Sequence, residues 1–125
     1  MTQNSVEKHA TAFIIEDDLK LATIFNKALE MANFETEIIQ DGRTALERLQ
    51  TVHPKLIVLD IQLPYISGED ILYLIRNDKH LMDIRVVVVT ADLFKAQSVR
   101  HAADQVVLKP VGFERLYNLI ISLEV

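Results

Sequence analysis

Several apolar runs of this chain end abruptly in residues that carry charge or form hydrogen bonds. Carboxylates follow the first run, at 12–15, and a single carboxylate follows the run at 56–59. A hydroxyl and an ammonium group follow two later runs. In chain order, the residues are Glu16, Asp17, Asp18, Asp60, Thr90 and Lys109. Together these groups provide oxygen ligands for a metal ion and donors for an anion.

The charge of this set predicts what it binds. Two carboxylates about 4 Å apart repel by roughly 4 kcal/mol at an effective dielectric near 20, so Glu16, Asp17 and Asp60 require positive charge nearby. Lys109 and one divalent cation would balance them. Because the set contains no Cys or His, it favours Mg²⁺, or Mn²⁺ in its place, over zinc. Asp60 would then act as a nucleophile toward a phosphoryl group whose other oxygens Thr90 and Lys109 hold.

The apolar runs that precede these residues predict buried strands. The runs at 12–15, 56–59, 86–89 and 106–108 are continuous rather than alternating, which is typical of strands covered on both faces. Residues 34–39 alternate more and predict an edge strand. In an open parallel sheet, ligands bind at the carboxyl ends of the strands, so we expect the polar residues to meet there.

Segments with helical periodicity separate the strands. Plausible N-caps are Asp18, Asp41, Ser67 and Asp92, and the least periodic helix is predicted over 92–102. Five strands that alternate with five helices predict an α/β protein with a doubly wound parallel sheet. We expect a flexible N-terminal lead-in at 1–10 and one domain at 11–125.

Composition excludes several classes of function. The chain has 125 residues, half of them hydrophobic, which suits one domain with a substantial core. Its net charge of −5 argues against direct binding of nucleic acid or of an acidic membrane. It has no cysteine, and its longest apolar runs are far shorter than the roughly 20 residues of a membrane helix. We therefore expect a cytoplasmic protein.

Four motifs of the chain resemble those of the receiver domains of two-component response regulators. The resemblance begins near Ala12, extends to the end of the chain, and follows the family's order and spacing. The motifs are Phe13-Ile14-Ile15-Glu16-Asp17-Asp18, Leu56-Ile57-Val58-Leu59-Asp60-Ile61-Gln62-Leu63-Pro64 with Gly68, Thr90-Ala91, and Lys109-Pro110.

The resemblance implies a flavodoxin-like fold with strand order 2-1-3-4-5 and a phosphoryl donor that is a sensor histidine kinase or a histidine phosphotransfer protein. By motif position, Asp60 corresponds to the phosphoacceptor, and Glu16 and Asp17 to the acidic metal-binding pair. Gln62 would offer its backbone carbonyl to the metal. Thr90 corresponds to the switch hydroxyl and Lys109 to the lysine that contacts the phosphoryl group.

The chain departs from the family pattern at three places. Val106 stands where the family usually has Tyr or Phe as a conformational gate. The segment 101–104 lacks the glycine that is common there, and Glu16 replaces the more frequent Asp. The first two departures concern how phosphorylation is transmitted outward.

Two other functions compete with a phosphorylated signalling switch. A phosphatase of the haloacid dehalogenase type also pairs an Asp nucleophile with Mg²⁺, Thr and Lys, but it needs a second Asp where this chain has Gln62. A receiver-like domain regulated by binding alone would usually lack the acceptor or the lysine, and both are present. We therefore expect a switch that modifies itself and is not a turnover enzyme.

The remaining polar and aromatic residues receive simpler interpretations. Arg76, Lys79 and Arg85 are predicted to be solvated charges. Phe94 and Tyr117 are interpreted either as a partner surface or as core or half-buried packing. The four histidines lack ligand spacing and are predicted to lie at the surface; they are His9, His53, His80 and His101.

Overall fold

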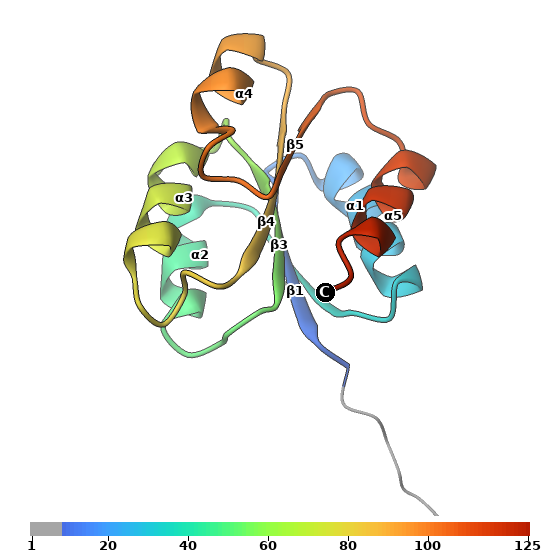
Figure 1. Ribbon diagram of the computed structural model, residues 1–125, viewed down its shortest axis with the longest axis horizontal. Helices are drawn as coiled ribbons and strands as arrows, with labels where there is room; N and C mark the ends of the chain where they lie inside the picture. The colour runs from blue at the N-terminus through green and yellow to red at the C-terminus, as the bar shows by residue number, and fades with distance from the viewer. Residues whose placement is uncertain (1–8) are drawn as a thin grey trace, which may run out of the picture.

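The computed structural model describes residues 9–125, in which five strands alternate with five helices (Figure 1). The elements are β1 (Thr11–Ile15), α1 (Leu19–Met31), β2 (Glu35–Ile39), α2 (Gly42–Leu49), β3 (Leu56–Asp60), α3 (Gly68–Asn77), β4 (Arg85–Thr90), α4 (Leu93–Val99), β5 (Gln105–Leu108) and α5 (Phe113–Ser122).

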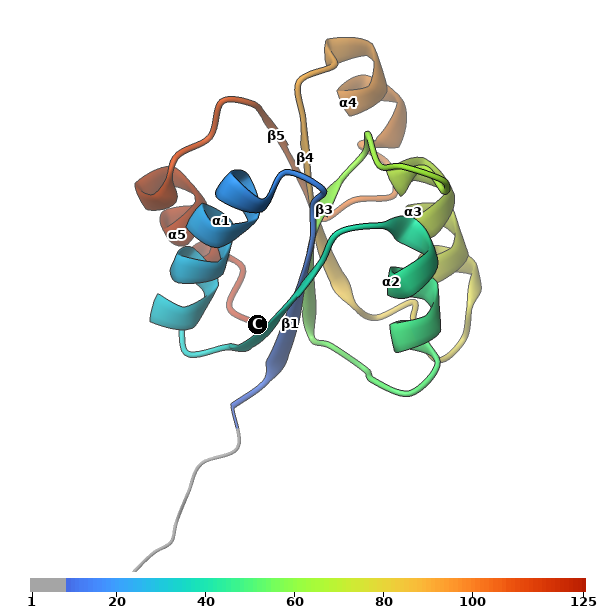
Figure 2. The ribbon, with the colours of Figure 1, turned by 180° about the vertical axis from the view of Figure 1, so that it is seen from behind.

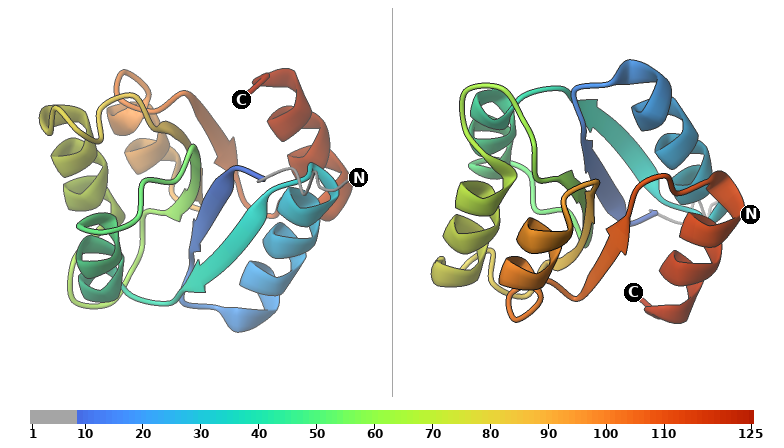
Figure 3. Two further views of the ribbon diagram at one scale, coloured as in Figure 1. Left: turned by 90° about the horizontal axis from the view of Figure 1, so that it is seen from below. Right: turned by 90° about the horizontal axis from the view of Figure 1, so that it is seen from above.

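The strands form one parallel sheet in the order β2-β1-β3-β4-β5. Helices α1 and α5 cover one face, and α2, α3 and α4 cover the other (Figures 1 and 2). The right panel of Figure 3 looks down on the carboxyl ends of the strands. The predicted fold class and strand order are confirmed.

The continuous apolar runs are buried because alternate residues face opposite layers. Phe13 and Ile57 join the core under α2 and α3, whereas Ile14 and Val58 join the core under α1 and α5. The edge strand β2 has only one buried residue, Ile39, as its more alternating sequence predicted.

Side-chain caps fix where four helices begin. The predicted N-caps Asp18, Asp41, Ser67 and Asp92 each accept a hydrogen bond from a backbone N–H in the first turn of the helix that follows. The predicted extent of the fourth helix is wrong at its end. Helix α4 stops at Val99, because the chain then turns back and the N–H groups of residues 102 and 103 both donate to the Val99 carbonyl.

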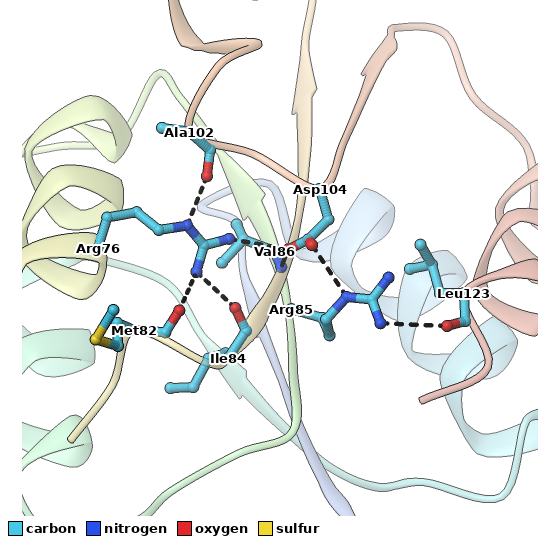
Figure 4. Close-up of polar contacts among 8 residues, drawn as sticks. All are labelled: Arg76, Met82, Ile84, Arg85, Val86, Ala102, Asp104 and Leu123. Carbon is cyan, nitrogen blue, oxygen red and sulfur yellow. Dashed lines mark hydrogen bonds and ion pairs between the residues drawn. The ribbon is translucent and has the colours of Figure 1, made fainter. Parts of the chain in front are cut away.

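The prediction that Arg76 and Arg85 are solvated charges is also wrong. Both guanidinium groups donate to the carboxylate of Asp104, and the Arg76 side chain is only 22% exposed (Figure 4). This network is not visible in the sequence, because its partners lie 19 and 28 residues away along the chain.

The other surface predictions have mixed outcomes. All four histidines are exposed, as predicted. Phe94 is 83% exposed, whereas Tyr117 is half-buried and stacks on Phe113. The predicted lead-in at 1–10 falls mostly outside the described residues and stays a prediction. Within residues 9–125, no helix is long and apolar enough to cross a membrane.

Candidate functional site

Two neighbouring strands bring the acidic residues together. Glu16 and Asp17 directly follow β1, Asp60 ends β3, and the two strands pair through Ile15 and Leu59. As a result, one carboxylate oxygen from each acidic residue lies within 4.8 Å of the other two. Asp18, the next residue along, turns away to cap α1 through the N–H groups at positions 20 and 21.

Burial makes this cluster electrostatically unfavourable without a cation. Glu16 is 1% exposed and Asp60 is 3% exposed, whereas Asp17 is exposed. Burial, with the nearby Asp60 carboxyl, raises the pKa of Glu16 to about 7. Glu16 Oε1 is buried, and among the described residues the Lys109 ammonium is its only close donor.

Lys109 supplies the positive charge closest to the buried carboxylates. Its Nζ lies 2.9 Å from Glu16 Oε1 and 3.4 Å from Asp60 Oδ2. Burial lowers the pKa of Lys109, but the two carboxylates outweigh burial and raise it overall. Its backbone N–H donates to the Thr90 carbonyl at 2.8 Å, which fixes the start of the segment after β5 beside the end of β4.

Thr90 and Gln62 complete the set. Thr90 is fully buried at the end of β4, next to β3, and its hydroxyl accepts a hydrogen bond from the N–H of Asp92 at 3.1 Å. The N–H of Gln62 donates to Asp60 Oδ1 at 3.1 Å, so the chain turns sharply after Asp60. The predicted role of the Gln62 carbonyl as a metal ligand stays a prediction.

Gly68, at the start of α3, packs directly on the backbone of Asp60. A Cβ at this position would overlap the Asp60 carbonyl oxygen and lie 2.6 Å from the Cα of Ile61. The Gly68 N–H donates to the Ile61 carbonyl at 2.8 Å. In the sequence this glycine belongs to the same motif as Asp60, and the structure adds that it packs against the end of β3.

Sequence reasoning missed one polar contact at the site. The Gln40 side-chain amide, just after β2, donates to the Asp17 carbonyl at 3.3 Å and so holds the loop that carries the exposed carboxylate. Its only signal in the sequence is its position directly after a strand that pairs with β1.

The donor set fits a hard divalent cation. Every candidate ligand is an oxygen, two of the three carboxylates are buried, and Lys109 supplies only one positive charge beside them. The exposed Asp17 leaves one side of the cluster open to solvent. Mg²⁺ suits this arrangement because it retains water at positions that a phosphoryl oxygen can occupy.

Residues 12–121 match the family described as the response regulator receiver domain. The chain belongs to this family. Receiver domains are signalling domains of two-component systems, so the predicted family and class of function are confirmed.

Relatives of known name cover most of the chain. It is 30% identical over 115 residues to the polar-differentiation response regulator DivK of Brucella ovis, covering 90% of this chain and 94% of DivK. It is 29% identical to the regulatory protein LuxO of Vibrio cholerae over 82% of this chain but only 23% of LuxO.

Solved structures support the fold. The bacteriophytochrome response regulator RtBRR has a TM-score of 0.82 and 26% identity, covering 94% of this chain and 80% of that one. The chemotaxis response regulator CheY4 of Vibrio cholerae has a TM-score of 0.84 and 21% identity, covering 93% and 99%.

Proposed function

We propose that this receiver domain accepts a phosphoryl group on Asp60 from a sensor histidine kinase or a histidine phosphotransfer protein. The observation that carries the proposal is the position of Asp60. Its carboxylate ends β3 within ion-pair distance of Lys109, and its oxygens lie near those of Glu16 and Asp17. Such a carboxylate is a nucleophile with the Lys109 ammonium on one side and, on the other, two carboxylates that would hold a divalent cation.

The transfer follows from this geometry. A carboxylate oxygen of Asp60 forms a bond to phosphorus while the bond from phosphorus to the donor imidazole nitrogen breaks, and the imidazole keeps that electron pair and takes up a proton. Lys109 stabilises the charge on the phosphoryl oxygens, and the Thr90 hydroxyl, at the end of the adjacent strand, would donate to them. The hydroxyl accepts from the N–H of Asp92, so its own proton is available for this hydrogen bond.

A divalent ion, Mg²⁺ or Mn²⁺, would be held by Glu16, Asp17 and Asp60 together with the carbonyl of Gln62. When bound, it neutralises the carboxylates and the incoming phosphoryl charge. The excess of three carboxylates over the single ammonium of Lys109 and the all-oxygen ligand set support this assignment. The protein would act in the cytoplasm by contact with other proteins, without binding nucleic acid or membrane.

The same geometry does not favour a turnover phosphatase. A phosphatase of the haloacid dehalogenase type needs an acid two residues after its nucleophile, and this chain has Gln62 there, exposed to solvent.

The test compares single phosphorylation with turnover. Incubation with acetyl phosphate and Mg²⁺ should add one phosphate mass, EDTA should prevent it, and phosphate release from small phosphoesters should stay at background. Steady release of phosphate, or phosphorylation that persists in EDTA, would contradict the proposal.

A further inference from the structure

The two ends of α4 are held by contacts of very different strength. At the carboxyl end, residues 100–104 (the 100–104 corner) connect α4 to β5. Asp104, its last residue, accepts three hydrogen bonds on one carboxylate (Figure 4). Oδ2 accepts from Arg76 at 2.9 Å and from the N–H of Val86 at 2.7 Å, and Oδ1 accepts from Arg85 at 3.0 Å.

Arg76 connects this corner to the segment before β4. Its Nε donates to the carbonyl of Ala102 at 2.6 Å, and one terminal nitrogen donates to the carbonyls of Ile84 at 2.7 Å and Met82 at 3.1 Å. One side chain of α3 therefore holds both the 100–104 corner and the segment before β4.

Further contacts strengthen the same end. Arg85 also donates to the carbonyl of Leu123 at 3.3 Å, at the end of α5. The rings of Tyr73 on α3 and His101 in the corner stack at a centroid distance of 6.0 Å. We call the set of contacts of Arg76, Arg85 and Asp104 the Asp104 clamp.

The amino end of α4 is held much more weakly. The N–H of Asp92 donates to the Thr90 hydroxyl at 3.1 Å, and Lys95 forms a 3.6 Å ion pair with Glu69, with 40% and 28% of the side chains exposed. Exposed ion pairs of this kind contribute little. Two large apolar residues of the first turn are also exposed; Leu93 is 53% and Phe94 is 83% exposed.

We propose that the Asp104 clamp fixes the 100–104 corner, so that phosphorylation signals outward through the first turn of α4 and not through β5. The inference rests on the proposed function, because it assumes that the Thr90 hydroxyl moves toward a phosphoryl group and so away from the N–H of Asp92. The released end carries Leu93 and Phe94, and these are the surface residues whose positions change.

The relative strength of the contacts supports this division. Hydrogen bonds that involve an ionised group are roughly twice as strong as neutral ones, and those of the clamp are partly shielded from water. Breaking the clamp would leave a half-buried carboxylate and several carbonyls without their donors. Val106, which follows Asp104 on β5, has no aromatic ring whose rotation would transmit a conformational change along β5.

Amide hydrogen exchange of the unmodified protein tests the clamp. Arg76→Met should speed exchange at Ala102, Ala103 and Asp104 by at least about tenfold relative to Lys79→Met, which equals about 1.4 kcal/mol of opening free energy. Lys79→Met is the matched control, because it removes one positive charge from the exposed residue just past the end of α3. Should Arg76→Met fail to fold, Arg76→Lys keeps the charge but not the forked donor. Unchanged exchange in the folded variant overturns the inference.

Beryllofluoride with Mg²⁺, as a phosphoryl mimic, tests the consequence. Amide resonances at 91–95 should shift in the wild type while those at 100–104 stay nearly constant, and Arg76→Lys should extend the shifts to 100–104. Large wild-type shifts at 100–104 overturn the inference but leave the proposed function intact if acetyl phosphate still adds one phosphate mass. If no phosphate is added, the proposed function fails, and with it the inference.

Discussion

Glu16 is the buried carboxylate whose protonation reports the charge balance of the pocket. Its folded pKa of about 7 lies above the ordinary value of 4.5. Without metal, its contribution to stability is therefore fully present below about pH 4.5 and is lost as the pH rises through about 7. We expect the melting temperature in EDTA to fall across this window, and Glu16→Gln, which cannot ionise, to flatten the fall. Glu47→Gln, at an exposed position, should not. An equal slope in wild type and Glu16→Gln would contradict this charge balance.

Asp17 and Asp18 are adjacent but should have different roles. Asp17→Ala should weaken Mg²⁺ binding markedly, as measured by titration calorimetry, because it removes a candidate ligand. Asp18→Ala should leave Mg²⁺ affinity nearly unchanged and cost about 1 kcal/mol of unfolding free energy, because Asp18 caps α1. A larger loss of Mg²⁺ affinity in Asp18→Ala would show that the acidic pair is displaced by one residue.

The sequence predicted that Glu16, Asp60 and Lys109 lie together, because each directly follows an apolar run and the ends of parallel strands meet. Contacts between side chains of separate elements could not be predicted from the sequence. The amide of Gln40 on the Asp17 carbonyl depends on the register of β2 against β1. The hydrogen-bond partners of Arg76 in the 100–104 corner depend on where the chain turns after α4.

At the scale of elements, the start of α3 determines where the end of β3 lies. Gly68→Ala should destabilise the fold and reduce phosphorylation of Asp60, because the added methyl overlaps the Asp60 carbonyl. Gly112→Ala is the matched control, since nothing lies within 4 Å of a Cβ there. Denaturant unfolding and intact mass measure the two effects. A Gly68→Ala protein as stable and as readily phosphorylated as Gly112→Ala would show that this close packing does not position Asp60.

The helix starts were predictable and one helix end was not. Asp92 and the other three caps are local signals, because the side chain bonds to its own first turn. The end of α4 at Val99 has no such signal in the sequence. It follows from the turn to Asp104, whose position is set by distant arginines.

At the scale of the whole molecule, metal binding should stabilise the native state. The native pocket collects three carboxylates that separate on unfolding, so a cation that binds only the native state raises stability by RT ln(1 + [L]/Kd). At ten times Kd this is roughly 1.4 kcal/mol. Thermal melts at neutral pH with increasing Mg²⁺ should show a rising melting temperature, and the rise should be largely lost in Asp17→Ala. A melting temperature indifferent to millimolar Mg²⁺ would argue against the metal site.

In the proposed function one carboxylate, Asp60, receives the phosphoryl group. The most direct measurement is the intact mass of wild type and Asp60→Asn after incubation with acetyl phosphate and Mg²⁺. Asn keeps the shape of the side chain but is not a carboxylate nucleophile, so the fold should persist while transfer stops. We expect one added phosphate mass in the wild type and none in Asp60→Asn. Equal labelling of the two proteins would contradict the assignment.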